Sequence, residues 1–101
     1  MINFTILLFK FIDDYELIET EVYRRAEIDR KLFSKIRCGQ VPSKKTIIKL
    51  CLSIGLTLEE SELLLMKAGY GDIYFDSKEK AEQAIEVVGK DRIKKYYLRV
   101  E

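Results

Sequence analysis

The residues with the clearest chemical potential are a cluster of cations between Arg24 and Lys49. This window contains nine lysines and arginines and two acids, so its formal charge is +7, whereas the whole chain of 101 residues carries +1. The basic residues are Arg24, Arg25, Arg30, Lys31, Lys35, Arg37, Lys44, Lys45 and Lys49. Segregated charge of this kind makes a directed field that attracts a polyanion even when the total charge is near zero.

The acids that balance this cluster lie mostly outside the window. They are Asp13, Asp14, Glu16, Glu19, Glu21, Glu59, Glu60 and Glu62. A charge cluster by itself is also typical of an ordinary solvated helix surface. A binding role is favoured here because the cations coincide with a pattern of two short helices joined through a glycine.

This pattern predicts a short helix at residues 29–37, a stop at Gly39 and a second helix that opens at Ser43. Within the first helix, the 3.6-residue period places Phe33 and Ile36 on one side and the cations on the other. A short polycationic helix after a tight turn has the size and charge to enter the major groove of DNA. We therefore predict a DNA-recognition helix at residues 29–37, docked on the core by Phe33 and Ile36.

Helical periodicity predicts further helices near residues 4–15, 19–26 and 58–68, and the helix from Ser43 is expected to stop at Gly55. Thr57 begins a capping box for the helix near residues 58–68, which is expected to end at Gly69. The expected inward-facing residues are Phe4, Leu7, Leu8, Phe11, Ile12, Tyr15, Val22, Tyr23, Ala26, Ile47, Leu50, Cys51, Ile54, Leu58, Ser61, Leu64, Leu65 and Ala68. The chain is thus expected to be all-α, with a five-helix domain at residues 1–70 and a short, mainly helical C-terminal extension at 71–101.

The C-terminal extension carries seven acids and seven bases, so it adds no electrostatic attraction to DNA. Its apolar residues recur at helical spacing and need a surface to cover them. On the first helix, Ile2, Ile6 and Phe9 form a second apolar edge. We expect the extension to pack on this edge and to build or buttress a dimer contact.

The composition excludes several classes of protein. Because the chain has no histidine, it has no Ser–His or Cys–His nucleophile pair, and no glycine-rich phosphate loop is present. We expect no enzymatic activity, no cofactor, no metal site and no small-molecule ligand. Cys51 is expected in the core and Cys38 at the surface, which suits a reducing cytoplasm. The apolar run at residues 6–9 is far too short to span a membrane, and no signal peptide is evident.

The segments YRRAEIDRKLFSKIR, PSKKT and AGY, in this order, resemble the lambda-repressor-like, Xre/Cro-type helix-turn-helix family. Within it, the chain is most similar to a bacterial and phage subgroup with a YxxAxIDRKLFSKIR signature. The similarity covers about Asn3 to Tyr70. Two features differ: the connection at residues 38–41 is shorter than in many members, and the residues after Tyr70 do not resemble their usual C-terminal part.

This resemblance implies a DNA-binding transcriptional regulator in which residues 19–26 form the positioning helix and residues 29–37 the recognition helix. The positions that correspond to base-contacting residues are Arg30, Lys31 and Lys35, which can donate to the O6 and N7 atoms of guanine. The positions expected to contact phosphate are Ser34, Arg37, Gln40, Ser43, Lys44 and Lys45. The expected partner is double-stranded DNA, bound by a homodimer that reads an inverted repeat.

A protein–protein interaction module that keeps the helix-turn-helix fold without binding DNA is the alternative, because a fold does not dictate one function. The nearly neutral total charge and the dissimilar C-terminal extension favour this alternative. The +7 window favours DNA.

Overall fold

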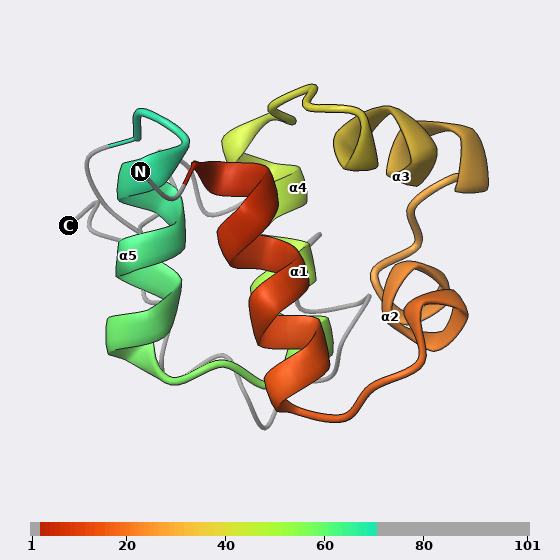
Figure 1. The fold of residues 1–101 in the computed structure, drawn as a ribbon, viewed down its shortest axis with the longest axis horizontal. Coiled ribbons are helices and arrows are strands. Elements are labelled where there is room, and N and C mark those ends of the chain that lie inside the picture. Colours follow the sequence, from red (N-terminus) through yellow and green to blue (C-terminus); the bar gives the residue numbers. More distant parts are fainter. Residues whose placement is uncertain (1–2, 71–101) are drawn as a thin grey trace, which may run out of the picture.

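The computed structural model describes residues 3–70, which form five α-helices and contain no strand (Figure 1). These are α1 (Phe4–Asp14), α2 (Glu19–Arg25), α3 (Arg30–Arg37), α4 (Lys44–Ile54) and α5 (Leu58–Lys67). Figure 1 shows α1 and α5 as an antiparallel pair with α4 behind them and with α2 and α3 at the other end. The expectation of five helices is confirmed for this part of the chain. The predicted C-terminal extension lies outside the described residues.

The helices begin and end where local chemistry predicts. The Asp29 carboxylate accepts a hydrogen bond from the backbone N–H of Lys31 at 2.7 Å, and Ser43 and Thr57 cap α4 and α5 in the same way. Thr57 and Glu60 form the predicted capping box, in which each side chain accepts from the other residue's N–H. Gly55 ends α4 in the left-handed region at φ 86°, which glycine adopts without steric cost.

Helix α4 lies at the centre of the core and packs against both α2 and α5. It is buried on nearly all sides, since its buried residues are Ile47, Ile48, Leu50, Cys51, Leu52, Ser53 and Ile54. The polar member of this set is satisfied, because the Ser53 hydroxyl donates to the carbonyl oxygen of Val22 at 2.7 Å. This bond joins α4 to α2 within the core.

Most of the expected inward residues are buried, and two expectations are wrong. Leu58 is 36% exposed because, as the first residue of α5, its side chain leans back past the helix end. Phe9 does not form a free edge on α1, because its ring packs edge-on against Phe33 with centroids 5.5 Å apart. Ile6 is exposed as expected, and Ile2 lies outside the described residues. Tyr15, Tyr23 and Ala68 are half-buried against the core.

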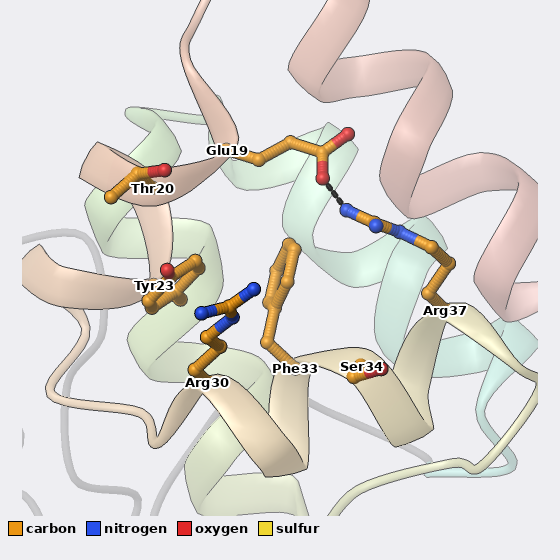
Figure 2. Close-up of a pocket in the computed structure, with 7 residues that line it drawn as sticks. All are labelled: Glu19, Thr20, Tyr23, Arg30, Phe33, Ser34 and Arg37. Atoms are coloured by element: carbon orange, nitrogen blue, oxygen red, sulfur yellow. Dashed lines mark ion pairs between the residues drawn. The ribbon is translucent and has the colours of Figure 1, made fainter.

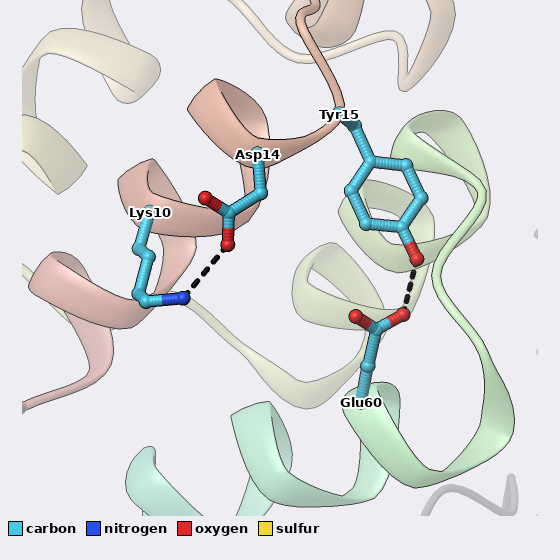
Figure 3. Close-up of polar contacts among 4 residues, drawn as sticks. All are labelled: Lys10, Asp14, Tyr15 and Glu60. Atoms are coloured by element: carbon cyan, nitrogen blue, oxygen red, sulfur yellow. Dashed lines mark hydrogen bonds and ion pairs between the residues drawn. The ribbon is translucent and has the colours of Figure 1, made fainter.

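A polar contact joins the end of α1 to the start of α5 (Figure 3). The Tyr15 hydroxyl donates to the Glu60 carboxylate, which also accepts from the backbone N–H of Thr57 at 2.9 Å. Burial by itself would raise the pKa of Glu60, but the hydrogen bonds from Thr57 and Tyr15 outweigh it and lower the pKa. The same bond to Glu60 raises the pKa of Tyr15, which keeps the hydroxyl as the donor.

This contact predicts that Tyr15→Phe lowers the free energy of unfolding by about 1 kcal/mol at neutral pH. Because folding lowers the pKa of Glu60, the stability it contributes is present above its ordinary pKa of 4.5 and is lost as the pH falls through its folded pKa. The difference in unfolding free energy between wild type and variant, measured by urea unfolding, should therefore shrink toward zero between about pH 5 and pH 3. Tyr23→Phe, which removes another half-buried hydroxyl, is the matched control. A difference that stays constant over this range would contradict the role of Glu60.

Candidate nucleic-acid interface

Helix α3 separates its apolar and cationic residues cleanly. Phe33 and Ile36 are 2% and 0% exposed, which confirms that they dock the helix on the core. Arg30, Lys31, Ser34, Lys35 and Arg37 are all exposed. At about 100° per residue, Lys31, Ser34 and Lys35 point most directly away from the buried pair, whereas Arg30 and Arg37 lie on the flank beside Phe33.

Two aromatic contacts and one hydrogen bond hold α3 in place. The Phe33 ring packs against Phe9 of α1 and against Tyr23 of α2, whose centroid is 5.1 Å away. The Thr5 hydroxyl of α1 donates to the carbonyl oxygen of Ile36 at 3.2 Å. Helix α3 is therefore positioned by both of the helices that precede it in the chain.

The turn between α2 and α3 depends on Glu27, which adopts a left-handed conformation at φ 52°. This conformation is uncommon for a residue other than glycine and costs free energy. It is stabilised by the N–H of Ile28, which bonds to the carbonyl oxygen of Tyr23 at 2.9 Å, and by the burial of the Ile28 side chain. With no glycine in the turn, the sequence carried no signal for this left-handed residue.

The Arg37 side chain points back toward Glu19 at the start of α2 (Figure 2). Its guanidinium forms an ion pair with Glu19 and lies 5.5 Å and 5.8 Å from the centroids of the Phe9 and Phe33 rings. A groove between α2 and α3 surrounds this pair; its lining residues are Glu19, Thr20, Tyr23, Arg30, Phe33, Ser34 and Arg37. Contact of Arg37 with phosphate stays a prediction. Glu19 was not among the predicted site residues, because no sequence spacing links it to Arg37.

The second predicted contact region is the connection from α3 to α4 and the first turn of α4. Gln40 and Ser43 are exposed in the connection, whereas Lys44 and Lys45 are half-buried on α4. The Ser43 hydroxyl already caps α4 by accepting from the N–H of Thr46 at 3.3 Å. Ser43, Lys44 and Lys45 lie at the start of α4, Gln40 lies three residues earlier, and no acid lies in the first turn of α4.

The cations extend along α4 to Lys49. Burial lowers the pKa of Lys49, and the nearby charge of Lys45 lowers it further, while Glu27 acts in the opposite direction. Neighbouring cations that disfavour each other's charge gain stability from an anion bound nearby. Repulsion between Lys45 and Lys49 is the smaller cause of this shift, and it marks the two lysines as neighbours on α4.

Two tyrosines near the candidate interface pack on the core. Tyr23 and Tyr70 are half-buried against the core, and the Tyr70 hydroxyl donates to the carbonyl oxygen of Pro42 at 3.3 Å. This bond ties the end of the described chain to the connection before α4. Pro42 is itself buried, so the connection also packs on the core at this residue.

Cys38 is exposed and Cys51 is buried, as expected; burial raises the pKa of the Cys51 thiol to about 12. Within residues 3–70, no cluster of three or more potential ligands could hold a metal ion. In the same range, no helix combines the length and the apolar character needed to cross a membrane. No protein-family model, curated protein or solved structure matches the chain.

The packing of Phe33 predicts a large effect of its truncation. Phe33→Ala should lower the free energy of unfolding by about 3–5 kcal/mol, because it removes a fully buried ring and leaves a cavity beneath α3. Urea unfolding followed by circular dichroism measures this loss. Met66→Ala on α5 is the control, since its side chain is 66% exposed and its loss should change the free energy by less than about 0.5 kcal/mol. Equal effects of the two substitutions would contradict the assigned role of Phe33.

Proposed function

We propose that the protein binds double-stranded DNA with sequence preference and acts as a transcriptional regulator, with α3 in the major groove. The observation that carries this proposal is the exposed row of Lys31, Ser34 and Lys35, with Arg30 exposed on its flank, on a helix whose opposite face is buried. The resemblance of residues 3–70 to the lambda-repressor-like helix-turn-helix family supports the same function.

The dimensions of α3 suit this role. An α-helix with its side chains is about 10–12 Å in diameter, which is close to the width of the major groove. Arg30 and Lys31 stand at its start and Lys35 stands one turn later, so all three can reach base edges from one side. Arginine and lysine donors match the O6 and N7 acceptors of guanine, and a half-site that contains guanine follows from this chemistry.

The start of α4 supplies the contacts to the DNA backbone in this proposal. The lysines at residues 44 and 45 supply positive charge at the start of α4, where the helix dipole also favours an anion such as phosphate. Gln40 lies in the connection just before and can donate to phosphate from its amide. Such contacts position the protein on DNA and do not read its sequence.

One such domain covers a single half-site, so a homodimer on an inverted repeat is part of the proposal. None of residues 3–70 is assigned to the dimer contact. The C-terminal extension at residues 71–101 keeps its predicted role in dimerisation as a hypothesis. A chain truncated after Gly71, compared with the full chain by mass measurement in solution, tests this assignment.

A protein-interaction module is the second candidate, and one surface favours it. Leu63 and Met66 lie one turn apart on the outward face of α5 and are 39% and 66% exposed. Contiguous exposed apolar surface is typical of a protein contact, whereas single exposed apolar side chains are ordinary. This surface lies on α5 and leaves α3 available, so the two functions are compatible.

Salt dependence tests whether the protein binds DNA. Affinity for a labelled duplex, measured by fluorescence anisotropy, should fall steeply as salt rises, with a log–log slope of about −0.9 for each phosphate that the protein neutralises. The cause is the release of counterions from DNA when the lysines and arginines bind. A slope near zero, or no binding of any duplex at low salt, would reject the proposed function.

Single substitutions then separate base contacts from phosphate contacts. After selection of a preferred site from random duplexes, Lys35→Ala or Arg30→Ala should relax the preference at one base position and cost about 1–3 kcal/mol of binding free energy. Lys45→Ala should weaken binding to all sequences alike. Lys10→Ala is the control, because Lys10 pairs with Asp14 on α1, outside the basic window. A changed base preference in Lys45→Ala alone would show that the assignment of α3 to the groove is wrong.

A further inference from the structure

The groove between α2 and α3 contains a charge pair that joins the two helices at their ends. Glu19 is the first residue of α2 and Arg37 is the last residue of α3. Figure 2 shows their side chains reaching toward each other across the groove, above the Phe33 ring. The pair is partly exposed, at 40% for the Glu19 side chain and 55% for the Arg37 side chain.

Apolar contacts alone leave the rotation of a short helix poorly determined. The burial of Phe33 and Ile36 presses α3 onto the core, but the hydrophobic effect has no direction. A guanidinium–carboxylate pair has a preferred geometry, and stacking of Arg37 over the rings of Phe9 and Phe33 restricts it further. The pair therefore restricts the rotation of α3 about its own axis, and this rotation sets the directions of the outward side chains.

Electrostatics makes the presence of Glu19 informative. It lines the same groove as Arg30 and Ser34, both of which belong to the surface proposed to face DNA. A carboxylate there repels phosphate and cancels the charge of Arg37. If this position contributed only to the overall affinity for DNA, an acidic residue would be unfavourable there.

We propose that Glu19 is a positioning residue, which holds Arg37 and so orients α3 for base recognition at the expense of general affinity for DNA. This inference rests on the proposed DNA binding. Arg37 is then the partner of Glu19 rather than a contact to phosphate. The pair increases the discrimination between the preferred site and other sequences, because it fixes the directions of Lys31 and Lys35.

Two isosteric substitutions with the same change of charge test this role. Glu19→Gln breaks the ion pair, whereas Glu21→Gln removes a carboxylate from the same helix, and among residues 3–70 the structure gives Glu21 no ion pair. Binding of each variant to the preferred site and to an unrelated duplex is measured at one salt concentration. Glu21→Gln should strengthen both alike. Glu19→Gln should strengthen binding to the unrelated duplex but lower the ratio of the two affinities about two- to fivefold.

Further variants separate orientation from stability. Arg37→Gln should lower the ratio to the same extent as Glu19→Gln, and the double variant should lower it no further, since both changes break one contact. Arg37→Lys keeps the charge but loses the planar guanidinium. Its ratio of affinities for the preferred and the unrelated duplex should therefore lie between those of wild type and Arg37→Gln. Thermal unfolding of each variant controls for the fold, and a change in the ratio at an unchanged melting temperature supports the positioning role.

The outcomes distinguish this inference from the function on which it rests. If the wild-type protein binds no duplex at any salt concentration, the proposed function and the positioning role fail together. If the wild type binds DNA and Glu19→Gln behaves like Glu21→Gln, only the positioning role is overturned. Additive effects of Glu19→Gln and Arg37→Gln on the affinity ratio would overturn it as well.

Discussion

The burial of Phe33 is the constraint on which the candidate interface depends. Its ring lies between an aromatic residue of α1 and one of α2, so three helices share this contact. A helix of eight residues is too short to be stable alone in water, and α3 exists because this face is buried. That burial decides which side of α3 faces solvent.

The same packing explains how a nearly neutral chain can offer a strongly basic surface. Burying an unpaired charge costs far more than leaving it in water, so the cations of α3 must face outward once Phe33 and Ile36 face inward. The left-handed Glu27 lets the chain turn between α2 and α3 without a glycine. Its energetic cost is offset by the buried Ile28 side chain that follows it.

Local sequence by itself determined the helices and their boundaries. The caps at Asp29, Ser43 and Thr57 act on N–H groups two or three residues away, so their effect is independent of the rest of the fold. The apolar period likewise identified the buried side of α3 and of α4. Both signals are short-range, and all five helices within residues 3–70 could therefore be predicted.

Tertiary structure decided the contacts between residues that are distant in the sequence. Phe9 was expected on an open edge and instead packs on Phe33, because α3 folds back against α1. The ion pair of Arg37 with Glu19, at the start of another helix, was likewise not expected from the sequence. Periodicity assigns a residue to a side of its own helix, whereas a partner on another helix depends on how the two helices pack, which no local pattern encodes.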